Sequence, residues 1–474
     1  MRRTKIVCTI GPATRSPRML ERLVLAGMNV VRLNFSHGAR ETKLGIIRDV
    51  REMAARLDRP LAILQDLAGP KLRIGGFANG PVVLRSGQTF TLTARDVPGD
   101  AAAVSLLYKD LPRDVNVGDT LLLADGALDM IVDKVDGPDI VCRVNVGGEL
   151  NSNKGINLPS GTVSAPILDD KDIADLRFGL EHGVDFVALS FVRSAADVRA
   201  CLAVMDEAGR HAPIIAKIEQ REAITNIEEI LSLVDGIMVA RGDLGVEIPM
   251  ENVPAVQKSL IARANAAGKP VITATQMLKS MVDSPRPTRA EVSDVANAIL
   301  DGSDAVMLSE ETAVGAHPVA AVETMARIAE AAEAVFPYRD WSARFAVRGS
   351  LSADEAVARA AVRMAEEIGA AAVVTLTRSG STTSLVAKHR PRQPILAMTD
   401  DAATWRRLSL VWGAVPMMAA SRDDLDALEG DAVRLAVACG CCRPGQTVVV
   451  TAGLPLHQPG HTNMIRIVEI PVSG

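Results

Sequence analysis

Eight short apolar runs, each followed at once by polar residues, constrain the fold of this chain more than any other feature. The runs are Lys5 to Cys8, Asn29 to Leu33, Leu61 to Leu64, Phe186 to Leu189, Ile214 to Ala216, Gly236 to Val239, Val271 to Ile272 and Ala305 to Leu308. Amphipathic stretches separate them, and a strand-helix-strand crossover makes its two strands parallel. Eight parallel strands are the number that closes a (β/α)8 barrel, so the sequence predicts a TIM barrel.

In such a barrel the residues after the strands meet at one mouth, where active sites lie. The polar residues at the ends of the runs or just after them are Arg32, Asn34, Ser36, His37, Asp66, Ser190, Lys217, Glu219, Arg241, Asp243, Thr275, Ser309 and Glu311. Random surface charges would not fall so regularly after strands. Lys217 and Glu219 follow one run, and Arg241 and Asp243 follow the next, after one helix expected over Glu222 to Leu233.

Two carboxylates from neighbouring strands, here Glu219 and Asp243, are a common way to hold Mg²⁺. This ion takes one or two protein carboxylates and keeps its other positions for water and substrate. Lys217, with Arg32 and Arg73 in reach, could neutralise a phosphoryl group during its transfer. The alternative is a ring of surface salt bridges with no chemical role.

Changes in the helix and strand patterns of the sequence divide the chain into four segments. Residues 1–69 hold the first three runs. From residue 70 to 165, helical spacing gives way to short β-rich runs separated by Gly, Asp and Pro turns, which predicts a small all-β domain inserted in the barrel. The barrel resumes over residues 166–337. Residues 338–474 alternate helix and strand patterns typical of a smaller open α/β sheet.

Charge and composition narrow the possible partners. Lys plus Arg number 52 against 57 for Asp plus Glu, and the net charge of −5 gives no attraction to nucleic acid or an anionic membrane. No apolar run reaches about 18 residues, the N-terminus enters a strand without a signal peptide, and the cysteines are mostly scattered. We therefore expect a cytoplasmic protein with no nucleic-acid or membrane partner.

Several segments in fixed order resemble one known family. They are TKIVCTIGPAT (Thr4 to Thr14), GMNVVRLNFSHG (Gly27 to Gly38), GINLP (Gly155 to Pro159), AKIE (Ala216 to Glu219), GIMVARGDLGVEIP (Gly236 to Pro249), TATQMLKSM (Thr273 to Met281), PRPTRAEVSDVANAILDG (Pro285 to Gly302) and MLSEETAVG (Met307 to Gly315). Through them the chain is similar to pyruvate kinase from Lys5 to the C-terminus.

The resemblance implies phosphoryl transfer from phosphoenolpyruvate to ADP, giving pyruvate and ATP, under an inserted domain that acts as a lid. It assigns catalysis to Lys217, Arg32, Arg73 and Thr275. It assigns the substrate to Arg32, Lys217, Gly242, Asp243, Thr275 and Ser190, and the nucleotide to Pro12, Asn34, His37 and Lys154. One Mg²⁺ would bind Glu219 and Asp243, and a second would arrive with the nucleotide. From the residues alone, Thr275 could equally be a buried turn hydroxyl.

Several positions depart from the family pattern. Many members bind K⁺ at positions that match Asn34, Ser36, Asp66 and Leu67. Those members read D-T-K-G-P-E where this chain reads D-L-A-G-P-K, so Lys71 places an ammonium group where an acid is usual. Lys71 could replace the K⁺ charge, and we predict turnover without added K⁺. Glu310 stands where a small residue is usual, and Val314 where many members have Lys.

The C-terminal segment resembles the family's regulatory domain. Its candidate effector-phosphate loop is Thr377, Arg378, Ser379, Gly380, Ser381 and Thr382. The tail GLPLHQPGHTNMIRI lacks the Trp-Arg pattern of members activated by fructose 1,6-bisphosphate. We expect either a sugar-monophosphate or nucleotide effector or no effector, and a homotetramer, as is usual in the family.

Two other functions stay open. A Mg²⁺-dependent pyruvate aldolase or phosphoenolpyruvate lyase could share the carboxylate pair, but it does not account for Lys217 together with the lid and Lys154. A homologue that binds phosphorylated ligands without turnover is disfavoured by the intact set of charged residues.

Overall fold

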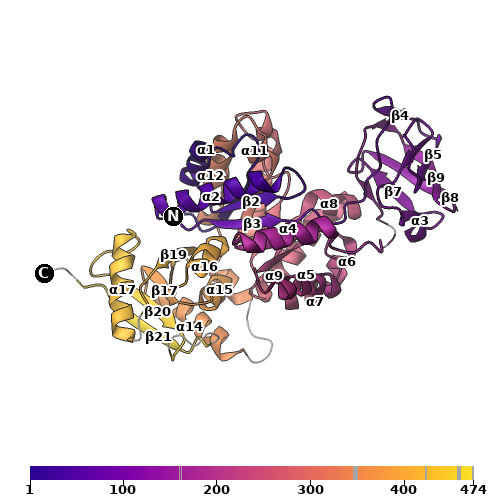
Figure 1. Ribbon diagram of the computed structural model, residues 1–474. Helices are drawn as coiled ribbons and strands as arrows, with labels where there is room; N and C mark the ends of the chain where they lie inside the picture. The colour runs from indigo at the N-terminus through magenta and orange to yellow at the C-terminus, as the bar shows by residue number, and fades with distance from the viewer. Residues whose placement is uncertain (160, 162, 345–350, 422–423, 456–460, 472–474) are drawn as a thin grey trace.

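The computed structural model describes residues 1–159, 161, 163–344, 351–421, 424–455 and 461–471. Figure 1 shows three bodies: a central barrel, a β-rich body at upper right, and an α/β body at lower left that carries the C-terminus. The predicted fold class, a TIM barrel with an inserted all-β domain and a C-terminal open α/β sheet, is confirmed. The four domain limits stay a prediction. No helix in the described part of the chain combines the length and apolar character that crossing a membrane requires.

Eight parallel strands close the barrel in the order β1-β16-β15-β14-β13-β12-β3-β2. They are β1 (Lys5–Thr9), β2 (Val30–Asn34), β3 (Ala62–Asp66), β12 (Phe186–Leu189), β13 (Ile214–Ile218), β14 (Gly236–Ala240), β15 (Val271–Ala274) and β16 (Ala305–Leu308). All eight predicted strands are present. Their side chains are almost all buried, because helices cover the outside of the barrel and side chains fill its inside.

The helices around the barrel follow the predicted rhythm with one correction. They are α1 (Pro17–Ala26), α2 (Arg40–Leu57), α4 (Asp170–Glu181), α5 (Ala195–Ala208), α6 (Arg221–Thr225), α7 (Ile227–Leu233), α8 (Arg241–Glu247), α9 (Val253–Ala266), α10 (Arg289–Leu300), α11 (Glu310–Ala313) and α12 (Pro318–Ala334), with 3-10 turns η1 (Met250–Asn252) and η2 (Lys279–Val282). The single helix predicted over Glu222 to Leu233 is wrong: α6 and α7 are separate helices that meet at Asn226. The Asn226 side-chain amide donates to the Arg193 carbonyl (2.9 Å), which fixes the break.

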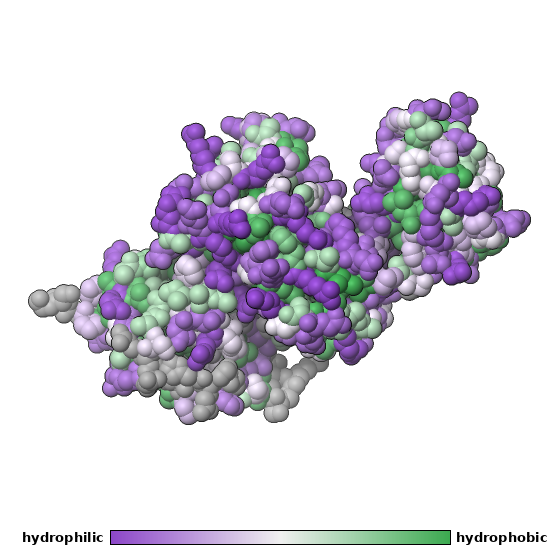
Figure 2. Space-filling view, in the orientation of Figure 1, coloured by the Kyte–Doolittle hydropathy of each residue, from purple (hydrophilic) through white to green (hydrophobic). Residues whose placement is uncertain are grey.

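The inserted domain, called the lid below, lies between β3 and β12 in the chain and has a hydrophobic core of its own. Its elements are β4 (Val82–Leu84), β5 (Thr89–Thr93), β6 (Ala103–Ser105), α3 (Leu111–Asp114), β7 (Thr120–Leu123), β8 (Leu128–Asp136), β9 (Asp139–Val146), β10 (Gly148–Leu150) and β11 (Ile156–Asn157). Six of the strands form one sheet in the order β11-β7-β8-β9-β5-β6. An open notch separates much of the lid from the barrel (Figure 2).

The C-terminal domain is a five-stranded sheet in the order β19-β18-β17-β20-β21, in which β21 is antiparallel to β20. Its elements are α13 (Tyr338–Arg344), α14 (Ala353–Glu367), β17 (Ala372–Leu376), α15 (Ser381–Lys388), β18 (Ile395–Thr399), α16 (Ala402–Arg407), the 3-10 turn η3 (Leu408–Leu410), β19 (Ala414–Met418), α17 (Leu425–Ala438), β20 (Thr447–Ala452) and β21 (Met464–Glu469). The bounds predicted for a helix over Thr404 to Leu410 are wrong, because α16 begins at Ala402 and ends at Arg407, and η3 begins at Leu408.

This domain closes the end of the barrel opposite the mouth. Leu410 belongs to the same buried cluster as the inward-facing barrel residues, and it is 1% exposed. Arg390, equally buried, donates to Asp304 Oδ1 (2.7 Å) and to the Gly302 carbonyl (2.6 Å) at the foot of β16. The mouth of the barrel therefore faces the lid, and its foot is sealed.

Candidate active site

Lys217 stands at the centre of the charged cluster at the mouth. Its Nζ lies 2.8 Å from Glu219 Oε1 and 3.3 Å from Asp66 Oδ1, and it donates to Ser190 Oγ (2.7 Å). Strands β13, β3 and β12 supply these groups, because the barrel brings their C-terminal ends side by side. The predicted meeting of Asp66, Ser190, Lys217 and Glu219 is therefore what the structure shows.

The charges in this cluster determine one another's protonation. Burial alone would lower the pKa of Lys217, but Asp66 and Glu219 outweigh it and raise that pKa. Burial would likewise raise the pKa of Asp66, but Arg32 and Lys217 lower it. Burial raises the pKa of Glu219, and the nearby charge of Asp243 adds to this effect while Lys217 opposes it. Lys217 thus remains an ammonium group at neutral pH, suited to attract phosphoryl oxygens.

Arg32 lies beside the cluster on β2. Its Nε donates to Asp66 Oδ2 (2.6 Å), and its Nη1 donates to Thr9 Oγ1 (2.8 Å) on β1. Thr9 in turn donates to the Leu308 carbonyl (3.0 Å). Thr9 is outside the predicted set of site residues. The sequence signal that could have identified it is its position directly after the first apolar run.

Asp243 lies in the first turn of α8, which begins directly after β14 as the sequence suggests. Its Oδ1 is 3.4 Å from Lys71 Nζ, and the same ammonium group is 3.6 Å from Asp125 Oδ1 on the lid. The structure thus directs Lys71 toward Asp243 and the lid. The interactions it records for Lys71 include none with Asn34, Ser36 or Asp66, the side chains of the predicted K⁺ site.

Thr275 and Gly242, predicted to hold a substrate carboxylate, lie against each other. The Gly242 amide donates to Thr275 Oγ1 (2.8 Å). Thr275 and the following Gln276 have positive φ angles of 72° and 56°, and such a conformation is costly for a β-branched residue such as Thr. The neighbouring structure must therefore hold this turn.

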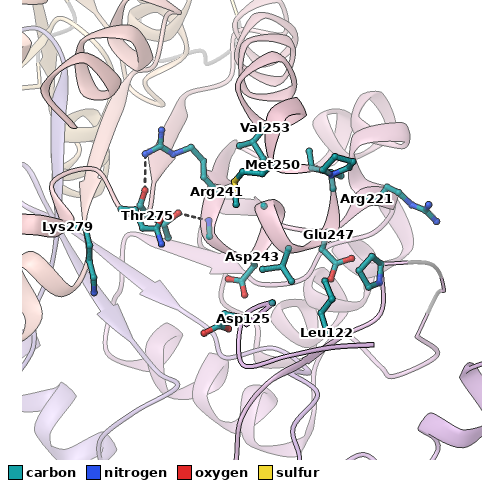
Figure 3. A pocket seen from close by; sticks show the side chains of 18 of the residues that line it. Leu122, Asp125, Arg221, Arg241, Asp243, Glu247, Met250, Val253, Thr275 and Lys279 are labelled. Carbon is teal, nitrogen blue, oxygen red and sulfur yellow. Dashed lines mark hydrogen bonds between the residues drawn. The ribbon is translucent and has the colours of Figure 1, made fainter. Parts of the chain in front are cut away.

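Arg241 holds the Thr275 turn in place. Its guanidinium donates to the carbonyls of Thr275 (2.9 Å) and Ala274 (3.3 Å), and it forms an ion pair with Asp294 (2.6 Å) on α10. Figure 3 shows Arg241 reaching across to the Thr275 carbonyl on one side, while the Thr275 hydroxyl meets the α8 backbone on the other. The sequence placed Arg241 at the mouth but gave no sign of its partner Asp294.

A cleft of about 1270 Å³ connects the mouth with the lid. Its walls include Arg241, Asp243 and Thr275 from the barrel and Leu122 and Asp125 from the lid (Figure 3). The cleft therefore leaves room for a ligand that touches both bodies.

The predicted nucleotide residues lie on two different bodies. Pro12, Ser36 and His37 are exposed on loops after β1 and β2, and Asn34 accepts from the Ser36 amide (2.9 Å). Lys154 is exposed on the lid. Arg73, also on the lid, donates to the Asn153 carbonyl (2.9 Å), so it lies beside Lys154 rather than in the Lys217 cluster.

The remaining mouth residues have structural contacts. Both carboxylate oxygens of Glu311 accept backbone N–H groups, from Leu278 (3.0 Å) and Ser309 (2.7 Å). Glu310 forms an ion pair with Lys279. Val314 is 57% exposed, so that loop presents an apolar surface where many family members carry a cation.

The candidate effector loop is a turn that leads into α15. The Gly380 amide donates to Thr377 Oγ1 (2.9 Å), Gly380 has a φ of 90°, and α15 begins at the next residue. Arg378 and Ser379 are exposed, and the hydroxyls of Thr382 and Thr462 are 2.9 Å apart. Of the tail noted in the sequence, residues 456–460 lie outside the described residues.

The donors at the mouth fit a divalent metal ion of the magnesium type. Glu219 and Asp243 are carboxylates on neighbouring strand ends, and the charge of Asp243 contributes to the raised pKa of Glu219. A hard dication removes that repulsion, and oxygen donors are the ligands it prefers. Glu219 and Asp243 are thus the residues that would hold it.

A closed barrel under a β lid, with a lysine fixed between carboxylates at its mouth, defines a class of lidded TIM-barrel enzymes. Family models described as "Pyruvate kinase, barrel domain" and "Pyruvate kinase, alpha/beta domain" match residues 1–322 and 355–468. The chain belongs to the pyruvate kinase family, whose members are phosphotransferases.

Individual relatives agree with this assignment. Pyruvate kinase 2 of Synechocystis sp. is 49% identical over 98% of this chain and 79% of its own length, and a pyruvate kinase of Staphylococcus aureus is 46% identical over 98% and 80%. The crystal structure of a pyruvate kinase from Cryptosporidium parvum superposes with a TM-score of 0.94 at 40% identity, covering 99% of this chain and 96% of that one.

Proposed function

We propose that this chain transfers the phosphoryl group of phosphoenolpyruvate to ADP, with Lys217 as the group that stabilises the phosphoryl group in flight. The observation that carries this proposal is the position of the Lys217 ammonium, buried and charged between Asp66, Glu219 and Ser190. Phosphoryl transfer depends mainly on positioning and on neutralising the equatorial oxygens. A buried cation at the mouth supplies that neutralisation.

The carboxylate end of phosphoenolpyruvate binds at Gly242, Asp243 and Thr275. There the first turn of α8 carries N–H groups and lies against the Thr275 hydroxyl, which accepts from the Gly242 amide. Arg32 binds phosphate oxygens beside Lys217, and Arg73 does so from the lid. When bound at Glu219 and Asp243, Mg²⁺ supplies further positive charge for the phosphoryl oxygens.

The nucleotide enters between barrel and lid with its own Mg²⁺, and it contacts Pro12, Asn34, His37 and Lys154. In the reaction the bond between phosphorus and the enol oxygen breaks, and a β-phosphate oxygen of ADP forms the new bond. The enolpyruvate left behind takes a proton at carbon, and Thr275 with a chain of waters is the first candidate donor. Lid closure excludes the water that would otherwise accept the phosphoryl group.

The proposal also covers the K⁺ requirement, the effector, the cellular location and the oligomeric state. Turnover needs no added K⁺, because the Lys71 ammonium group supplies a positive charge at the mouth. Residues 377–382 bind a phosphate-bearing effector, either a sugar monophosphate or a nucleotide. The protein is a cytoplasmic homotetramer. A flat response of the substrate affinity to a panel of sugar phosphates and AMP would argue against the effector.

One coupled assay tests the reaction. Pyruvate formation from phosphoenolpyruvate is followed with and without ADP and with and without Mg²⁺. A kinase requires both, a phosphoenolpyruvate lyase or pyruvate aldolase does not require ADP, and a binding protein forms no pyruvate under any condition. Pyruvate formation at full rate without ADP would refute the proposal.

A further inference from the structure

Helix α8 faces the lid at three points along its length. At its first turn, Lys71 bridges Asp243 and the lid residue Asp125. Further along, a side-chain carbon added at Gly126 of the lid would lie 3.8 Å from Val246 Cγ1. At its last residue, Asn157 of β11 donates from Nδ2 to Glu247 Oε1 (2.8 Å). The helix that carries Gly242 and Asp243 is therefore also the surface on which the lid rests.

The third contact differs from the first in burial. Asn157 is 7% exposed and Glu247 is 6% exposed, whereas Lys71, Asp125 and Asp243 are all partly or well exposed. Gln220, the residue after Glu219, is a second hydrogen-bond partner of the Glu247 carboxylate. A buried carboxylate that loses its donors is far more costly than an exposed one, so this contact tolerates little displacement.

We propose that Glu247 and Asn157 form the pivot of the lid and are positioning residues for the kinase reaction. This inference rests on the function proposed above. The pair fixes one end of the segment that joins the lid to the barrel, while the exposed Lys71 contacts can break and reform as the lid moves. The Glu247–Asn157 pair thereby determines where the lid residues Arg73 and Lys154 lie relative to Asp243.

Because Asn157 lies on β11, a displacement of Asn157 also displaces the lid cations Lys154 and Arg73. Asn157 is the last residue of β11, which is paired with β7, and Lys154 precedes that strand by two residues. Arg73 bridges to Gly155 in the same short segment. A shift of Asn157 along α8 therefore carries both lid cations with it, whereas Thr275 stays in place on the barrel.

If Glu247 and Asn157 form the pivot, replacing either residue should affect KM for ADP and kcat more than KM for phosphoenolpyruvate. In Glu247→Ala and in Asn157→Ala, we expect KM for ADP to rise at least fivefold and kcat to fall at least fivefold. KM for phosphoenolpyruvate should rise by a smaller factor, because Arg73 shifts but the barrel contacts of this substrate stay in place. The double variant should be no worse than Glu247→Ala alone, because that single variant already removes the bond to Asn157. Glu247→Gln keeps an acceptor oxygen for Asn157 and should stay within twofold of wild type. Glu251→Ala, which removes an exposed carboxylate near α8, is the matched control.

The possible outcomes separate the pivot from other roles. If KM for phosphoenolpyruvate rises as much as KM for ADP, the pair merely supports α8 and the pivot is refuted. It is equally refuted if the two single variants behave like Glu251→Ala, if the double variant shows additive losses, or if Glu247→Gln fails to restore the constants. Thermal melting checks folding, and if Glu247→Ala does not fold, Asn157→Ala tests the pivot with α8 unaltered. A wild-type enzyme without ADP-dependent turnover would instead refute the proposed function.

Discussion

Lys71 Nζ lies 3.4 Å from Asp243 Oδ1, so a lysine near the start of the inserted domain is paired with a predicted Mg²⁺ ligand. Family members that bind K⁺ carry an acid at the position of Lys71. We predict that wild-type turnover in a buffer with only organic cations changes less than twofold when KCl is added. Lys71→Glu should become K⁺-dependent, with at least a tenfold activation, which corresponds to about 1.4 kcal/mol.

The K⁺ prediction has a matched control in Lys134→Glu, which makes the same charge change at an exposed position of the lid. This variant should respond to KCl as the wild type does. Collapse of wild-type activity in the K⁺-free buffer, restored by KCl, would show that Lys71 does not replace the ion.

Arg241 offers a test of the turn that carries Thr275. Its guanidinium donates to two successive carbonyls and is held by Asp294, a geometry that the single ammonium of lysine does not reproduce. We predict that Arg241→Lys raises KM for phosphoenolpyruvate about tenfold, equivalent to roughly 1.4 kcal/mol, while KM for ADP changes less. Steady-state kinetics with each substrate varied in turn measure the two constants.

The control for Arg241 is Arg263→Lys, which alters an exposed arginine on α9 that pairs with Glu228 across the surface. Both KM values should stay at their wild-type levels there. If Arg241→Lys matched this control, the Thr275 turn would be shown to hold without the guanidinium.

Lys217→Met tests the central assignment. Losing the buried cation should reduce kcat by a factor on the order of 10²–10³ or more, as removal of a transition-state charge partner does elsewhere. The fold should survive, because Asp66 keeps its pairing with Arg32 (2.6 Å) and Glu219 keeps the Phe191 amide (2.9 Å). Stopped assays measure turnover, and cooperative melting verifies the fold.

Lys258→Met, on the exposed face of α9, removes a lysine without touching the mouth and should leave turnover intact. Wild-type turnover in Lys217→Met would refute the role assigned to that residue, whatever the control shows.

The barrel and most of its mouth could be predicted from the sequence because both follow from local rules. Strands buried on two faces read as continuous apolar runs, and the polar residues after them must meet at one rim. The sequence therefore predicts that Lys217, Glu219 and Asp243 lie at one rim. The break between α6 and α7 was not predictable, because the Asn226 side chain that makes it bonds to a carbonyl 33 residues away.

The contacts between domains could not be predicted from the sequence either. The run Leu408 to Leu410 has the pattern of a helix end, and nothing local indicates that Leu410 enters the barrel interior. Likewise, the motif around Lys71 shows the change of charge but not the direction of the side chain. Its contact with Asp243 depends on how the lid sits on α8, which is set by side chains distant in the sequence.

Lys5 provides a pH-dependent test of the junction between barrel and C-terminal domain. Its Nζ is buried and donates to the Ala414 carbonyl (2.6 Å) at the start of β19. Burial, with a smaller contribution from Arg2, lowers the pKa of Lys5 to about 7. Above that pH the folded protein holds Lys5 neutral, while the unfolded chain still binds a proton up to about pH 10. The unfolded state then binds more protons, so stability contributed by this group rises with pH and is lost as the pH falls toward 7.

We therefore predict that raising the pH from 7 to 9 stabilises the wild type relative to Lys5→Met, by at most about 1.4 kcal/mol per pH unit. Methionine has a similar length and no charge, so every other titrating group cancels in the comparison. Chemical unfolding of both proteins at several pH values gives the difference, with melting midpoints as a second measure. Parallel pH profiles for the two proteins would show that Lys5 stays protonated in the folded state, held there by the carbonyl and by the neighbouring Glu333 and Asp304.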